Sequence, residues 1–185
     1  MTTENPEYNY RGQLNNYVFN SVVEGEKREK TLLEYLCRKN IILNKTSKYK
    51  HYDFTFSKNK HILLEFKSIN YSINTFENVF IGFDKLLFYF YKQYKNPDVV
   101  FILIYGFYEK IDGDLKIKYR YDVINVKVYL FEYSKRLLQN KKHINIPTNT
   151  LKPLKHLITA LRETSLNNTT NDFLKHLEIL ENPES

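Results

Sequence analysis

A chain of 185 residues is long enough for one domain with a substantial core, and 42% hydrophobic with 26% charged residues exclude a disordered protein. A single cysteine, Cys37, excludes an internal disulfide framework and favours a reducing, intracellular setting. We expect neither a signal peptide nor a transmembrane segment, because the first residues are polar and the longest apolar run, 99–107, is far below the roughly 20 residues that span a bilayer. The net charge of +7 suggests a polyanionic partner, although a solvated lysine surface gives the same charge.

The first part of the chain predicts an arm, a helix and a short strand. Residues 1–20 are polar and aromatic and predict an N-terminal arm, whereas 21–185 predict one domain. Residues 41–46 predict a short strand. Between them, residues 22–40 have the spacing of an amphipathic helix, whose apolar stripe contains Leu32, Leu33 and Leu36.

A hairpin follows, and it has the strongest pattern in the chain. In residues 51–57 and 61–67, every second side chain is apolar and most of those between are polar. This alternation predicts two strands that are each buried on one face. A three-residue turn at 58–60, centred on Asn59, brings the two apolar faces together, whereas a two-residue turn sets each apolar face against a polar one. The predicted apolar face consists of Tyr52, Phe54, Phe56, Ile62, Leu64 and Phe66.

In this register Asp53 lies directly opposite Glu65. Such a pair has its Cβ atoms about 4.5–5.5 Å apart, so the two negative charges repel each other. Lys67 shares the face of Glu65, because strand residues two apart point the same way. Carboxylate oxygens select hard cations such as Mg²⁺ or Mn²⁺ rather than zinc, so the three side chains predict a divalent-cation site. The alternative is a structural ion pair between Glu65 and Lys67 on a solvated face.

The middle of the chain predicts a second helix and a buried strand. Residues 68–75 are polar and predict a loop, and 76–95 carry aromatic residues at three- and four-residue steps, which predicts a helix that Pro97 ends. Residues 99–105 are apolar without alternation, as is typical of a strand covered on both faces. Residues 112–113, Asp-Gly, predict a hairpin turn.

After this turn the chain predicts an addition to the core. Its expected elements are strands at 115–121 and 123–132, a short helix through Leu138, a connector at 144–147, and amphipathic helices at 151–163 and 171–180. The fold class is therefore α/β, with a mixed β-sheet flanked by helices. The core, residues 22–110, has the order α-β-β-β-α-β, and residues 111–185 add a hairpin and helices.

This order of elements, with Asp53 followed by Glu65-Phe66-Lys67, resembles the PD-(D/E)xK nuclease superfamily, which has the restriction-endonuclease-like fold. The resemblance covers about the first 110 residues. Residues 25–29, Gly-Glu-Lys-Arg-Glu, match the Gly-x-x-x-Glu motif at the start of the first helix of archaeal Holliday-junction resolvases. The chain departs from the family at Tyr52, where a proline usually precedes the aspartate.

The resemblance implies a catalytic site and its metal. Asp53, Glu65 and the backbone carbonyl of Phe66 would bind Mg²⁺ or Mn²⁺, and Lys67 would be the catalytic lysine. Glu29 would be a third acid near the metal. The alternative is that Glu29 is an ordinary surface charge on the first helix.

The implied function is a metal-dependent nuclease, expected to be an endonuclease, that hydrolyses phosphodiester bonds of duplex or branched DNA. The alternatives are a non-catalytic nucleic-acid-binding protein and a structural protein that keeps the same fold. Because cutting both strands usually needs two sites, a homodimer through the C-terminal helices is plausible. The residues expected to contact nucleic acid are Lys48, Lys50, Asn70, Tyr71, Asn74 and Lys92.

Overall fold

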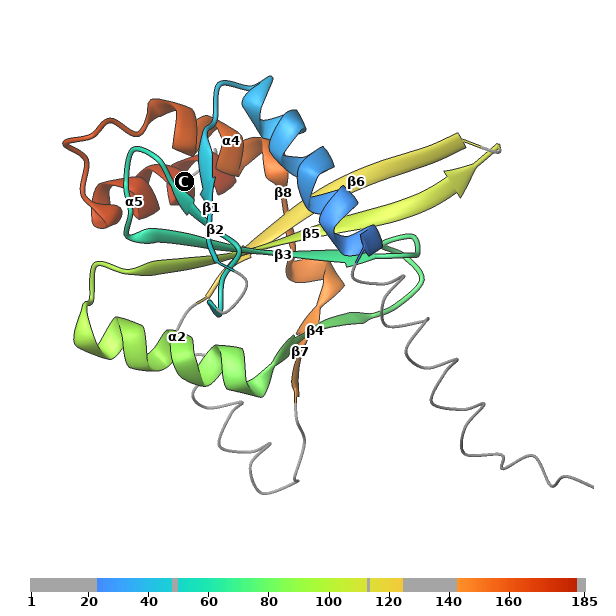
Figure 1. Ribbon diagram of the computed structural model, residues 1–185, viewed down its shortest axis with the longest axis horizontal. Coiled ribbons are helices and arrows are strands. Elements are labelled where there is room, and N and C mark those ends of the chain that lie inside the picture. The colour runs from blue at the N-terminus through green and yellow to red at the C-terminus, as the bar shows by residue number, and fades with distance from the viewer. Residues whose placement is uncertain (1–22, 48–49, 113, 125–142, 183–185) are drawn as a thin grey trace, which may run out of the picture.

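The computed structural model describes residues 23–47, 50–112, 114–124 and 143–182, and all structural statements concern these residues (Figure 1). They form an α/β protein with four α-helices, a mixed six-stranded sheet and a second sheet of two strands. None of these helices is long and apolar enough to cross a membrane. The expected arm at 1–20, Lys48, and the strand and helix expected between 125 and 138 lie outside the described residues.

The main sheet combines an antiparallel meander with one parallel pair. Neighbouring strands pair antiparallel throughout, except that β3 and β5 run parallel. The parallel pair places β3 and β5 at the centre of the sheet, where both faces are covered. The strand order is β1 (Leu43–Lys45), β2 (Phe54–Phe56), β3 (Ile62–Ile69), β5 (Val100–Ile111), β6 (Asp114–Val123) and β8 (Lys152–Pro153).

Helices cover the two faces of this sheet unequally (Figure 1). The helix at residues 23–37 lies on one face together with α4 (Leu154–Glu163) and α5 (Thr170–Glu181). The other face is covered by α2 (Phe83–Lys95) and the two-stranded sheet. Two separate core clusters result, and alternate residues of β3 enter one or the other.

The expected positions of several elements are confirmed. The first helix, β1, the strands β2 and β3, and the two C-terminal helices lie within or close to their predicted ranges. In β5, the described burial is continuous over residues 100–109, as the unbroken apolar run predicts. Ile111 of β5 pairs with Asp114 of β6, so the two strands form the predicted hairpin, and Asp112 has the positive φ (54°) of a tight turn.

Two predictions about the smaller sheet are wrong. Residues 78–82, expected to begin the second helix, form β4 (Asn78–Gly82), and the expected connector is β7 (His143–Pro147). The physical reason is a period-two match between the strands. Val79 and Ile81 of β4 lie opposite Ile146 and Ile144 of β7, and these four side chains are buried.

We predict that the small sheet contributes substantially to stability through Ile81, which is fully buried. Ile81→Ala should lower the free energy of unfolding by about 2–5 kcal/mol, because it leaves a cavity beneath α2. Urea denaturation measures this change. The matched control is Ile42→Ala at a residue that is 62% exposed, where we expect a change within about 0.5 kcal/mol. Equal effects of the two substitutions would contradict the packing described.

Candidate active site on strand β3

The backbone kinks at Asp53, where β2 begins. The ladder pairs Phe54 with Leu64, as the turn centred on Asn59 predicts, but the Asp53 N–H also donates to the Leu64 carbonyl (3.0 Å). Two residues thus oppose one on β3, which is the arrangement of a β-bulge and re-aims the side chains before it.

The kink explains why the predicted orientation of Tyr52 is wrong. Tyr52 packs against the core cluster on the α2 face, with its ring centroid 6.3 Å from that of Phe88 and 6.5 Å from that of Phe101. Phe54, two residues later, packs into the opposite cluster. Regular alternation would place both rings on the same face, so the change of face arises at the kink.

The same kink puts the Asp53 carboxylate at the end of the β2–β3 ladder. Its Oδ2 accepts a hydrogen bond from the Phe66 N–H (2.8 Å), in the place where a longer β2 would supply a backbone carbonyl. The Tyr52 carbonyl accepts instead from the hydroxyl of Thr46. Because the N–H and C=O of one strand residue point to the same side, the Phe66 carbonyl also faces the side of Asp53.

Glu65 is the buried acid of the site. It is only 4% exposed, and its Oε1 accepts a charged hydrogen bond from Lys85 of α2. Its Oε2 is buried and has no hydrogen-bond partner. The pKa of Glu65 is raised to about 7, mainly by burial and then by the negative charge of Asp53, while Lys85 and Lys67 lower it in part. The ladder ends at the pair Phe54–Leu64, so Asp53 and Glu65 are not the directly opposed cross-strand pair that the sequence predicts, although the charge of Asp53 still acts on Glu65.

Lys67 lies two residues further along β3, on the face of Glu65. Its ammonium donates to the Phe80 carbonyl of β4 (3.3 Å) and lies 5.2 Å from the centre of the Phe80 ring. Burial lowers the pKa of Lys67, and the charge of Glu65 opposes this shift. A lowered pKa makes a lysine a better proton acceptor near neutral pH.

Glu29 is not assembled with the other acids. Its carboxylate forms an ion pair with Lys45 of β1 (2.7 Å), and this hydrogen bond is the main reason why the pKa of Lys45 is raised. The charge of Asp53 also raises the pKa of Lys45, by less than Glu29 does. Among the described residues, no three His, Cys, Asp or Glu side chains are grouped so that they could hold a metal ion.

Two of the expected nucleic-acid contacts meet on the α2 side of the site. The Lys50 ammonium lies 5.7 Å from the centre of the Tyr52 ring, and that of Lys92 lies 5.5 Å from the centre of the Phe88 ring. The two rings are themselves neighbours, with centroids 6.3 Å apart. Both lysines are exposed, so this cluster presents positive charge beside aromatic surface near Asp53.

The other expected contacts lie in the loop after β3. Asn70 accepts a hydrogen bond from Arg28 of the first helix, whose guanidinium also lies over the Tyr108 ring (4.3 Å). Tyr71 is half-exposed and Asn74 is exposed. These residues therefore lie on the same side of the molecule as the end of β3, past Lys67.

Sequence reasoning missed Lys85, Phe80 and Tyr105. Lys85 reaches Glu65 only because α2 packs across β3, and no sequence spacing reports this contact. Tyr105 pairs with Lys67 across the parallel strands β3 and β5, so its side chain lies on the same face. A signal for Tyr105 does exist, because it is a tyrosine inside the apolar run at 99–105.

The fold and the site together define an α/β protein whose central strand carries a buried acid between two lysines. Comparisons of the chain with protein-family models, with curated proteins and with solved structures found no match.

The available oxygen atoms suit a hard cation. Glu65 Oε2 is a buried carboxylate oxygen without a partner, and an uncompensated buried polar atom of this kind favours an incoming cation. The Asp53 carboxylate, which accepts from the Phe66 N–H, and the Phe66 carbonyl would be the further oxygen ligands. This all-oxygen set fits Mg²⁺ or Mn²⁺ and does not fit zinc.

We predict that Glu65 makes the metal-free protein less stable as the pH rises. The folded state binds the proton of Glu65 up to a pKa of about 7, against an ordinary value of 4.5. Stability should therefore fall between about pH 4.5 and pH 7, by at most about 3 kcal/mol from this group. Urea denaturation in EDTA across this range measures the slope.

Glu65→Gln should remove this part of the slope, because glutamine does not titrate. The matched control is Glu178→Gln on α5, an exposed acid, which should keep the wild-type slope. A Glu65→Gln variant with an unchanged slope would show that Glu65 is not a perturbed acid.

Proposed function

We propose that the protein is a metal-dependent nuclease of the PD-(D/E)xK type that hydrolyses DNA phosphodiester bonds. The observation that carries the proposal is the convergence of Asp53, Glu65 and Lys67 at one end of the β2–β3 ladder, with a carboxylate oxygen that is buried and unpartnered. Perturbed carboxyl and lysine pKa values in the same small region are typical of catalytic sites.

In this proposal three groups hold the cation: the carboxylates of Asp53 and Glu65 and the backbone carbonyl of Phe66. When bound, Mg²⁺ or Mn²⁺ supplies Lewis-acid chemistry at a phosphoryl oxygen and at water. The hydrogen bond from the Phe66 N–H fixes one oxygen of Asp53, which leaves its other oxygen for the ligand role. Glu29 has no place in this set, because it is paired with Lys45.

Lys67 acts on the phosphate and on the attacking water. Hydrolysis joins the water oxygen to phosphorus and breaks the bond from phosphorus to one sugar oxygen. The proton lost by water passes to Lys67 in its neutral form or to solvent, and the departing sugar oxygen takes up a proton. As an ammonium, the same side chain balances the negative charge that develops on the phosphate. The Phe80 carbonyl holds Lys67 in place for both roles.

DNA is proposed as the substrate because the family resembled by the sequence acts mostly on DNA. Supporting observations are the net charge of +7 and the exposed pair Lys50 and Lys92 beside the site. The proposed homodimer would use α4 and α5, on the sheet face opposite Lys85, where Ile179 is 64% exposed. A monomeric mass in solution at micromolar concentration would count against the dimer.

A second candidate function is non-catalytic nucleic-acid binding, and one observation favours it. Lys85 already pairs with Glu65, so the buried charge has a cationic partner in the chain itself. In this alternative Lys85 permanently replaces the metal, and the surrounding lysines bind nucleic acid without cutting it. The two candidates differ in whether Mg²⁺ or Mn²⁺ changes the DNA.

We predict that the wild-type protein cuts DNA in Mg²⁺ or Mn²⁺ and not in EDTA. A gel assay with supercoiled plasmid, linear duplex and a four-way junction measures this. Asp53→Asn and Lys67→Met should lower the cleavage rate by about 100-fold or more, because each removes a charge from the reacting centre. Asp53→Asn keeps an oxygen acceptor for the Phe66 N–H, so folding should be retained.

The matched controls are Asp114→Asn at the mouth of the β5–β6 hairpin and Lys39→Met in the turn after the first helix, both exposed and outside the proposed site. Both controls should cut at the wild-type rate. Binding without cleavage in Mn²⁺ would favour the second candidate. A failure to bind DNA at low salt would overturn both.

A further inference from the structure

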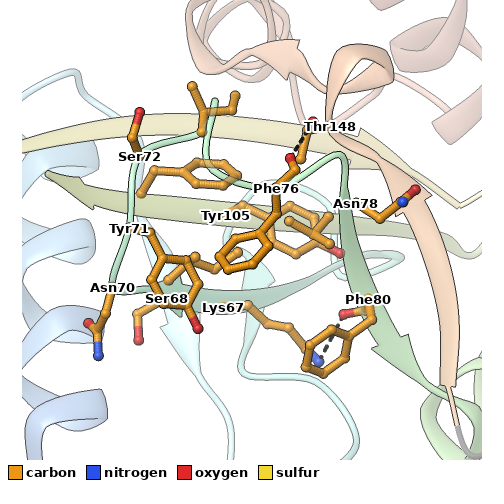
Figure 2. Close-up of a pocket in the computed structure, with 14 residues that line it drawn as sticks. Lys67, Ser68, Asn70, Tyr71, Ser72, Phe76, Asn78, Phe80, Tyr105 and Thr148 are labelled. Carbon is orange, nitrogen blue, oxygen red and sulfur yellow. Dashed lines mark hydrogen bonds between the residues drawn. The ribbon is translucent and has the colours of Figure 1, made fainter.

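A pocket of about 550 Å³ adjoins Lys67, between the main sheet and the small sheet (Figure 2). It is lined by the end of β3 and the loop that follows, by β4 with the residues before it, by β5, and by Thr148. Its volume lies within the range of roughly 300–1,000 Å³ that is typical of ligand sites. The residues that matter for its chemistry are Lys67, Tyr71, Phe76, Phe80, Tyr105 and Phe107.

Three exposed aromatic side chains surround the pocket. Tyr71, Phe76 and Phe80 are 48%, 51% and 58% exposed. The rings of Tyr71 and Phe76 lie side by side in Figure 2, with centroids 4.7 Å apart and planes at 64°. Large aromatic surface left in water is unfavourable, and a cluster of it around a concave site marks a place where a flat apolar surface docks.

A buried polar group without a partner lies behind the floor of the pocket. Tyr105 is fully buried, and its hydroxyl has no hydrogen-bond partner in the described residues. Leaving such a group unpaired costs about 1–3 kcal/mol. The hydroxyl has no exposed surface of its own, so a ligand removes this cost only if its donor or acceptor displaces the side chains in front of it.

The third feature is the cation beside the pocket. Lys67 is both a lining residue and the lysine proposed to face the reacting phosphate. Any ligand in the pocket is therefore adjacent to the point where an anionic phosphate would lie. Aromatic walls, a polar floor and a neighbouring ammonium match the three parts of a nucleotide: the flat face of its base, the hydrogen-bonding edge of the base, and its phosphate.

We propose that this pocket receives one unstacked nucleobase from the strand whose phosphate lies at Lys67. The inference rests on the proposed function and adds the way in which the substrate is held. The base stacks on the exposed ring of Phe76 beside Tyr71, and its edge reaches the buried Tyr105 hydroxyl once the side chains in front of that hydroxyl shift. A nucleotide that is already unpaired, at a single-stranded end or a branch point, enters at the lowest cost, which favours such substrates over uninterrupted duplex.

The test compares strands with and without one base. Fluorescence anisotropy in EDTA measures binding of a labelled single-stranded 12-mer and of a series in which one nucleotide at a time is replaced by an abasic residue. For the wild type, one or two neighbouring abasic positions should weaken binding by roughly tenfold. Phe76→Ala should weaken binding of the full strand by a similar factor. The variant should bind the abasic strand no more weakly than it binds the full strand.

Tyr105→Phe supplies an independent test without a change of shape. Because the hydroxyl has no partner in the protein, its removal should leave the thermal midpoint unchanged or raised, while binding of the full strand weakens several-fold. Tyr94→Ala, at an exposed aromatic residue on α2 outside the pocket, should bind like the wild type.

The results separate this inference from the proposed function. Two results would contradict nucleobase binding in the pocket and leave the proposed nuclease activity intact. One is cleavage in Mn²⁺ without any effect of an abasic position on binding, and the other is an equal loss of affinity for full and abasic strands in Phe76→Ala. A base-dependent effect without cleavage would support the pocket and overturn the nuclease. A protein that binds none of the strands would overturn both.

Discussion

Burial of the Glu65 carboxylate is the constraint on which the rest of the candidate site depends. A charge on the central strand of a covered sheet loses most of its hydration, and it is tolerated only when neutralised by a proton or by a cation. Oε1 of Glu65 forms an ion pair with Lys85 of α2, which packs across the strand, and Oε2 has no hydrogen-bond partner. Asp53 adds a second negative charge nearby, which makes the need for positive charge greater.

The surrounding elements can be understood from this constraint. The kink at Asp53 ends the β2–β3 ladder early, so a carboxylate takes the place of a backbone carbonyl beside Phe66. The small sheet of β4 and β7 then holds Lys67 through the Phe80 carbonyl. It also forms one wall of the aromatic pocket. Lys67 and Phe80 of this wall lie next to each other in the pocket (Figure 2).

Much of the fold was open to prediction because the patterns were local. Period-two alternation fixed the register of β2 and β3, since a shift of one residue would have buried the polar face. The unbroken apolar run predicted that β5 is covered on both faces. The alternation also placed Glu65 and Lys67 on one face of β3, whereas the position of Asp53 depends on the kink before β2.

The remaining features depend on contacts between distant segments. Val79, Phe80 and Phe83 fit a helical stripe, and only the pairing with β7 makes residues 78–82 a strand. Tyr52 changes face at a bulge that alternation does not reveal. Lys85 belongs to the site because of the way in which α2 packs on the sheet, and a lysine in the first turns of an amphipathic helix carries no sign of it.

The most direct test of the account is a calorimetric titration of the protein with Mn²⁺ at pH 6, 7 and 8. If Glu65 and Asp53 hold a cation, one ion should bind per chain and displace the proton of Glu65. The affinity should then rise up to about tenfold per pH unit below the pKa of about 7 and level off above it. Glu65→Gln should bind much more weakly and without this dependence. No binding at pH 8, or equal affinity in Glu65→Gln, would contradict the account.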